Sequence, residues 1–193
     1  MDIASFLGTV NVFDVLILLA LFGSFIVGFI QGTIRRLLGI ISIVFSFFLA
    51  ANVKEPLGSF LGREWDQFPP QYGEMIGFLT IFVAGVVASS LVIQGTYKKT
   101  QLFEKYQFVD ELIAGMLGVF QFAMLLTFLT IILDSYFLIG LARDPDEIHF
   151  LRGFWEPLSQ SGTGALLHDL IIPRFVGIFA FLIPASVEAF YHR

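Results

Sequence analysis

Four stretches of the chain contain no charged residue and approach or exceed the length that crosses a lipid bilayer. They are residues 15–34, 37–53, 75–97 and 112–133. A membrane-spanning helix needs about 20 consecutive apolar residues, because each residue advances the helix by roughly 1.5 Å. The pattern predicts an all-α membrane protein, a bundle of about four transmembrane helices that span residues 13–33, 36–53, 75–97 and 111–133.

The composition agrees with a lipid environment. The chain is 56% hydrophobic and 14% charged, whereas a soluble domain is about a quarter charged. A soluble core could not hide so many apolar side chains without leaving large exposed patches. The net charge of −5 and the lack of a basic patch exclude nucleic acid as a partner. The lipid bilayer is the expected surrounding.

Only Arg35 and Arg36 separate the first two apolar stretches. This spacing predicts a tight helical hairpin whose arginines, at the turn, reach the lipid headgroups. The length of residues 37–53 leaves a second interpretation open, in which this segment lies in the membrane interface.

Basic residues in two loops predict the orientation. The first loop holds Arg35 and Arg36, and the loop after residue 97 holds Lys98, Lys99 and Lys105. Basic residues of short loops face the cytoplasm. We therefore expect these two loops inside and both termini on the extracytoplasmic side.

The chain changes character after residue 133. A polar turn occupies residues 143–147, and a second break with helix-capping residues occupies 161–164. Between this break and Pro173 we expect one short helix, at residues 164–172.

Residues 175–187 are apolar but contain Pro184, and they are too short to span a bilayer comfortably. The sequence therefore predicts a transmembrane domain at 1–133, followed by an extracytoplasmic or interfacial helical cap at 134–193. A distorted fifth span at 175–187 is the alternative, and it would place the C-terminus inside.

No set of residues with catalytic or metal-binding spacing stands out. An intramembrane protease needs paired aspartates, a serine with a histidine, or an H-E-x-x-H helix. The three histidines (His149, His168 and His192) all lie in the tail, without a second ligand at metal-like spacing, and there is no cysteine. We expect no enzymatic activity, no cofactor and no metal.

Small residues recur at a spacing of four at three of the apolar stretches, one pair being Gly73 and Gly77 at the start of the third. Gly28 and Gly32 form a second pair, and Ala114 and Gly118 form another. At this spacing the small residues share one helix face and let another helix approach closely. They predict helix packing, and a homo-oligomer interface is the functional alternative.

Three polar residues lie at the ends or in the interior of the apolar stretches. Asp14 precedes the first stretch and Asp110 the fourth, where solvation at the interface is expected. Gln121 lies near the middle of the fourth, so its amide should face the bundle interior and bond another helix. Alternatively, these three residues line a path through a small oligomeric transporter or channel.

Two blocks of the sequence resemble the colicin V production protein family, the CvpA-like inner-membrane proteins of bacteria. Residues 11–39 contain N-x-F-D, a long apolar run, and then G-x-x-x-G-x-x-R-R-x-L-G. In the block VDELIAGMLGVFQFAMLL, the family's aspartate and its two small residues correspond to Asp110, Ala114 and Gly118. The family often has Arg-Gly where Gln121 and a phenylalanine stand here.

The resemblance covers roughly residues 10–135. It implies a bacterial inner-membrane protein associated with producing or exporting the peptide toxin colicin V, and with envelope maintenance. We therefore expect a non-enzymatic factor that acts through contacts with other envelope proteins. A small oligomeric transporter or channel is the alternative.

Overall fold

The structure, a computed structural model, describes residues 11–64, 70–97, 102, 105–137 and 149–179. In these ranges all regular structure is helical. The four long helices are α2 (Val12–Gln31), α3 (Thr33–Glu64), α4 (Pro70–Thr96) and α5 (Gln107–Phe137). Each has the length and apolar composition of a membrane-spanning helix. The predicted all-α bundle of four spans is confirmed, and the chain is a multi-pass membrane protein.

The second span is longer than the sequence predicted. α3 has 32 residues, and its part Thr33–Phe60 has the length and apolar composition of a spanning helix, so the helix extends beyond the predicted span 36–53. The helix continues through Lys54 and Pro56. The ammonium group of Lys54 lies 5.8 Å from the ring centre of Phe78 on α4, and its aliphatic stem can cover apolar surface. An interfacial placement of this segment does not fit a helix that packs along α4.

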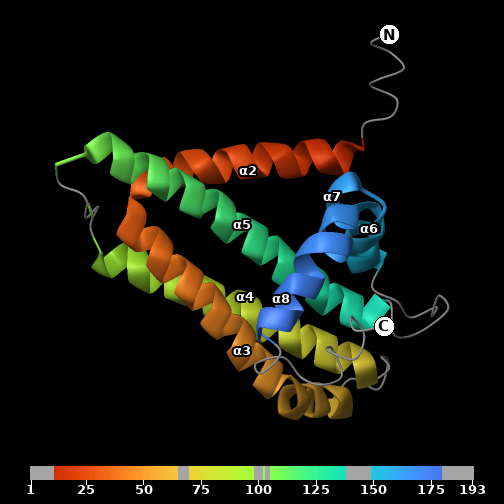
Figure 1. Ribbon diagram of the computed structural model, residues 1–193. Helices are drawn as coiled ribbons and strands as arrows, with labels where there is room; N and C mark the ends of the chain where they lie inside the picture. Colours follow the sequence, from red (N-terminus) through yellow and green to blue (C-terminus); the bar gives the residue numbers. More distant parts are fainter. Residues whose placement is uncertain (1–10, 65–69, 98–101, 103–104, 138–148, 180–193) are drawn as a thin grey trace, which may run out of the picture.

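α2 and α3 meet at Gly32, whose φ of 86° lies in the region that favours glycine. The chain turns at this residue, so Arg35 and Arg36 fall in the first turn of α3. From here α2 leaves α3 and packs along α5 (Figure 1). The predicted tight hairpin with both arginines at its turn is therefore wrong.

α5 lies between α2 and the antiparallel pair formed by α3 and α4 (Figure 1). Aromatic rings fill the place where α3, α4 and α5 meet. The rings of Phe47 and Phe128 stack with centres 4.2 Å apart, and Phe82 meets both rings edge-on. Such pairs add to the stabilisation that the burial of apolar area provides, so this cluster anchors the central part of the bundle.

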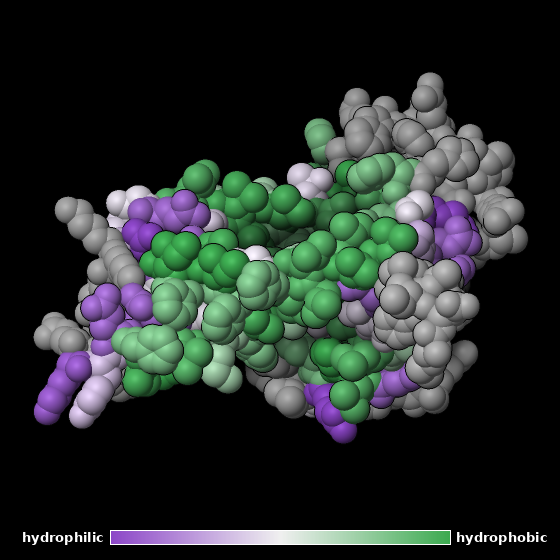
Figure 2. Space-filling model, turned by 90° about the horizontal axis from the view of Figure 1, so that it is seen from above, coloured by the Kyte–Doolittle hydropathy of each residue, from purple (hydrophilic) through white to green (hydrophobic). Residues whose placement is uncertain are grey.

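Hydrophobic side chains cover the middle of the surface in Figure 2, and hydrophilic side chains gather toward its ends. The exposed apolar side chains include Leu18 and Phe22 on α2 and Leu91 on α4. In water, a continuous surface of this kind promotes association. Around a bundle of spanning helices it is the surface that faces lipid.

Four shorter helices follow, namely α6 (His149–Ser159), α7 (Gly162–Leu166), the π-helix η1 (Leu167–Ile171) and α8 (Ile172–Phe179). The break at Ser161 is confirmed as a helix start, because its hydroxyl accepts a hydrogen bond from the N–H of Gly164 at 2.9 Å. The expected helix end before Pro173 is wrong. The N–H of Ile172 bonds the carbonyl of Leu167, and this wide π turn accommodates a proline ring that a regular α turn would exclude.

η1 and α8 lie beside the membrane-spanning part of α5 (Figure 1). The ring centre of Phe175 is 4.9 Å from that of Phe128 on α5, and Ile172 and Val176 are completely buried. This segment of the helical tail predicted for residues 134–193 packs against the bundle, and its side of the membrane stays a prediction. The buried apolar side chains of Leu167, Ile172 and Val176 fix this position.

Parts of the tail lie outside the described residues. They include the polar turn at residues 143–147 and everything after residue 179. The choice between a fifth span and an interfacial helix at residues 175–187 therefore stays a prediction.

Candidate functional site

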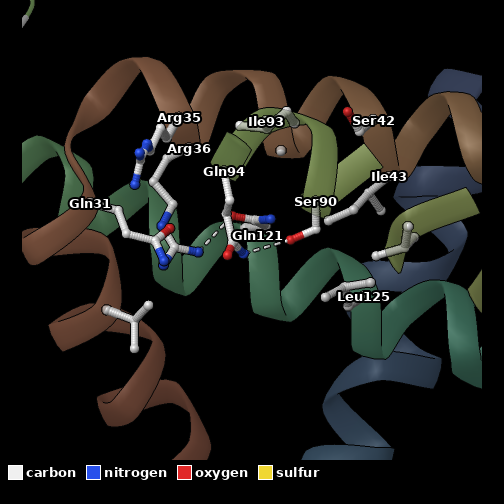
Figure 3. Close-up of a pocket in the computed structure, with 13 residues that line it drawn as sticks. Gln31, Arg35, Arg36, Ser42, Ile43, Ser90, Ile93, Gln94, Gln121 and Leu125 are labelled. Carbon is white, nitrogen blue, oxygen red and sulfur yellow. Dashed lines mark hydrogen bonds between the residues drawn. The ribbon is translucent and has the colours of Figure 1, made fainter. Parts of the chain in front are cut away.

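All four long helices contribute to a cavity of about 210 Å³. Its polar side chains converge from different helices, as Figure 3 shows. The lining residues are Val27 and Gln31 of α2, Arg35, Arg36, Gly39, Ser42 and Ile43 of α3, Val86, Ser90, Ile93 and Gln94 of α4, and Gln121 and Leu125 of α5. The cavity is thus a polar pocket within a largely apolar bundle.

Arg36 directs its side chain into this cavity (Figure 3). The residue is only 9% exposed, and its Nη1 donates a hydrogen bond to Oε1 of Gln121 at 2.8 Å. Its Nε is buried and forms no hydrogen bond within the described part of the chain. A charge held inside a membrane bundle is costly and commonly marks a functional position. The predicted role of Arg36 at a lipid-facing turn is therefore corrected.

Gln121 forms the cross-helix hydrogen bond that the sequence predicted. α3 and α5 also meet at Thr33, whose hydroxyl donates a hydrogen bond to the carbonyl of Asp110 at 3.0 Å. Gln121 lies three turns beyond Asp110, about 16 Å further along α5.

Gly39 makes room for the Gln121 amide. A side-chain carbon at Gly39 would stand 2.6 Å from Nε2 of Gln121, closer than a carbon atom can approach a nitrogen atom to which it is not bonded. The absence of a side chain lets the amide rest against α3 beside Arg36. The glycine, the arginine and the glutamine therefore form one packed unit.

α4 completes the cavity from the other side. Arg35 donates from Nε to the carbonyl oxygen of Tyr97 at 2.6 Å, and its Nη2 bonds the same oxygen. This contact satisfies a carbonyl at the end of α4 that the helix leaves free. Gln94 donates from Nε2 to Oγ of Ser90 at 3.0 Å. Sequence reasoning missed Gln94, although it is a polar residue near the end of an apolar stretch.

The cavity wall is suited to binding. It carries two guanidinium groups, three amides and two hydroxyls, and none of its lining residues is acidic. Arginine offers several N–H donors in a planar group, and its hydrogen bonds to anionic oxygens are stronger than those between neutral groups. The arrangement can therefore hold a polar or negatively charged group.

The predicted small-residue faces meet each other inside the chain. A side-chain carbon at Gly28 would stand 2.3 Å from the carbonyl oxygen of Ala114, and one at Gly118 would stand 2.3 Å from that of Ser24. Ala114 is completely buried. These residues bring α2 and α5 into close contact, whereas Gly32 forms the turn between α2 and α3. Their use as a homo-oligomer interface stays a prediction.

Asp14 ties the start of α2 to α7. Its Oδ1 accepts hydrogen bonds from the backbone N–H and the hydroxyl of Thr163 at 2.8 and 2.6 Å, and its Oδ2 accepts one from the N–H of Gly162 at 3.0 Å. A carboxylate at the start of a helix satisfies N–H groups that the helix leaves free. Asp14 is therefore an anchor for the C-terminal helices.

Replacement of Asp14 by alanine is expected to loosen α7. Amide hydrogen exchange at residues 162–166 should become about fivefold faster, because loss of a helix cap costs about 1 kcal/mol of local stability. Asp169 is exposed, so Asp169→Ala removes the same charge without this contact and should leave exchange near the wild-type rate. Equal exchange in both variants would contradict the anchoring role.

Asp110 lies apart from both the cavity and the contact of Asp14 with α7. Its side chain is completely buried, and Oδ1 accepts a hydrogen bond from the N–H of Leu102 at 2.9 Å, whereas Oδ2 has no partner in the described part of the chain. The structure does not bring Asp14, Asp110 and Gln121 together. A path that they line between the protomers of an oligomer stays a prediction.

A further polar contact was missed by sequence reasoning. Asp134, at the end of the fourth span, is completely buried. Its Oδ1 accepts a hydrogen bond from the indole N–H of Trp155 at 2.7 Å, and its Oδ2 lies 3.5 Å from Nδ1 of His168. The sequence offers one signal, because Asp134 is the first charge after an apolar stretch. Its partners on later helices are not deducible from that position.

The comparison with known families agrees with this architecture. Residues 13–142 match the family described as colicin V production protein. No match was found among curated proteins or among solved structures. The family match covers well over half of the 193 residues and includes all four spanning helices. This multi-pass membrane protein therefore belongs to the colicin V production protein family.

Proposed function

We propose that the protein is a non-enzymatic factor of the bacterial cytoplasmic membrane that acts through contacts with other envelope proteins. Membership of the colicin V production family supports a role in the production or export of a peptide toxin, or in envelope maintenance. The side chains in the cavity support binding, because guanidinium, amide and hydroxyl groups can form several hydrogen bonds to a ligand.

We place the proposed contacts with other proteins on the outward face of α2. Of the four spanning helices, α2 has the smallest buried share, and Leu19 and Phe22 are 60% and 64% exposed. Nothing lies within 4 Å of the position that a side chain on Gly23 would take. Small residues let helices approach closely in lipid. The spanning helix of a partner can therefore pack on α2 at this level.

A photo-crosslinking amino acid at Phe22 is expected to give a discrete protein adduct in intact cells. The same amino acid at Ile17, which is 7% exposed, is the matched control and should react only within the chain. Adding Gly23→Leu should abolish the Phe22 adduct while the protein level is kept, because the leucine blocks close approach. Adducts with lipid alone would contradict the proposed contact.

The basic residues beside the cavity support an orientation with both termini outside. The chain has no cysteine, so single cysteines can report it. Lys105 and Gln160 are both exposed and lie toward opposite ends of the bundle. A membrane-impermeant maleimide should label Gln160→Cys in intact cells and Lys105→Cys only after the membrane is opened. Labelling of both before opening would overturn the orientation.

A further inference from the structure

Arg36 is a buried cation that lacks a matching negative charge in the described part of the chain. Its neighbour Gln121 carries a neutral amide that accepts one hydrogen bond from Nη1 of Arg36. Nε remains unbonded although it is buried. A guanidinium group has five N–H donors, and a buried donor without a partner is costly. The protein alone therefore leaves Arg36 incompletely satisfied.

The cavity beside Arg36 has room for a larger ligand than water. Its volume is about 210 Å³, whereas one water occupies about 30 Å³ in the liquid. Ser42, Ser90 and Gln31 add hydroxyl and amide groups to its wall. An anion in this space would meet a positive charge and several donors without meeting an acidic lining residue.

The cavity adjoins the ends of two helices. Gln31 is the last residue of α2, and Gln94, which is exposed, lies in the last turn of α4. Arg35 stands beside them and is half-buried. A ligand can therefore meet Arg35 first, at the end of the bundle that carries the basic loops, and Arg36 deeper inside.

We propose that this cavity binds a phosphate group, with Arg36 as its principal ligand. Arginine pairs with the oxygens of a phosphate through its N–H donors, and the Arg36 side chain lines the cavity. The group comes either from an anionic phospholipid of the adjoining leaflet or from a soluble phosphate. This inference is independent of the proposed contact through α2.

The test uses the full chain in an uncharged maltoside detergent, with thermal unfolding and native mass spectrometry as readouts. Three additions separate the sources: phosphatidylglycerol, a diacylglycerol with the same acyl chains but no phosphate, and inorganic phosphate. The variants are Arg36→Gln and Ser42→Leu, which fills the cavity and keeps the charge. Lys105→Gln is the control, because Lys105 is an exposed cation outside the cavity.

Phosphatidylglycerol or inorganic phosphate should stabilise the wild-type protein and Lys105→Gln by several degrees, while diacylglycerol should not. A response to phosphatidylglycerol alone identifies a lipid headgroup, and a response to inorganic phosphate identifies a soluble ligand. Arg36→Gln and Ser42→Leu should each weaken binding by about tenfold or more. If Arg36→Gln does not fold, the binding measured for Ser42→Leu decides whether the cavity is the phosphate site. The proposal is overturned by no response in any arm, by an equal response to diacylglycerol, or by wild-type binding in Ser42→Leu.

Discussion

Leucine at Gly28 is expected to force α2 away from α5 and to leave little folded protein in the membrane. The first side-chain carbon alone would stand 2.3 Å from the carbonyl oxygen of Ala114 and 3.0 Å from the Cα of Gly115. Both obstacles are backbone atoms, which cannot rotate aside. Overpacking of this kind costs about 3 kcal/mol or more, which corresponds to a fall of roughly 6–12 °C in melting temperature. Gly118→Leu should behave in the same way.

Gly23→Leu is the matched control for this experiment. It places the same side chain on the same helix, where nothing lies within 4 Å, and should leave the melting temperature within about 1–2 °C of wild type. The comparison is measured on purified protein in detergent and by protein level in cells. Equal loss of stability in both variants would contradict the close packing of α2 on α5. A stable Gly23→Leu protein that has lost its crosslinks would instead locate the partner surface.

The four spans were predictable from sequence because the property that defines them is local. A stretch without charge and of bilayer length has few alternatives to a spanning helix. The helix boundaries were less accurate, since α3 continues through Lys54 and Pro56, and a hydropathy pattern does not record contacts such as that of Lys54 with the Phe78 ring. Pro173 shows the same limit, because a single π turn before it allows the helix to continue.

The pairings between helices were not predictable from the sequence. A small-residue motif indicates that a helix face can pack closely, but it does not identify the helix that packs against it. The spacing of Gly28 and Gly32 indicated close packing, but not that Gly28 meets Ala114 while Gly32 forms the turn. Arg36 and Gln121 each stood out for a different reason, and 85 positions separate them. Their contact depends on α5 packing beside the first turns of α3. This tertiary arrangement turns an arginine that resembled a topology signal into the centre of a cavity.

Gln121→Leu is expected to destabilise the bundle by leaving the Arg36 charge buried without its amide partner. A hydrogen bond to a charged group contributes about 1.5–3 kcal/mol, so the melting temperature should fall by roughly 3–12 °C. Gln107→Leu is the control on the same helix. Gln107 is exposed and bonds Glu111 one turn away, and its replacement should change the melting temperature by about 1–2 °C at most.

A double-mutant cycle shows whether the contact itself carries the effect. Arg36→Leu removes the charge, and the pair Arg36→Leu with Gln121→Leu removes both polar groups, so the double variant should be more stable than the sum of the single losses predicts. Strict additivity would mean that the two side chains act separately. Phosphate binding gives the cycle a second readout. Phosphatidylglycerol or inorganic phosphate should restore part of the stability lost in Gln121→Leu, where Arg36 is still present, and none of that lost in Arg36→Leu.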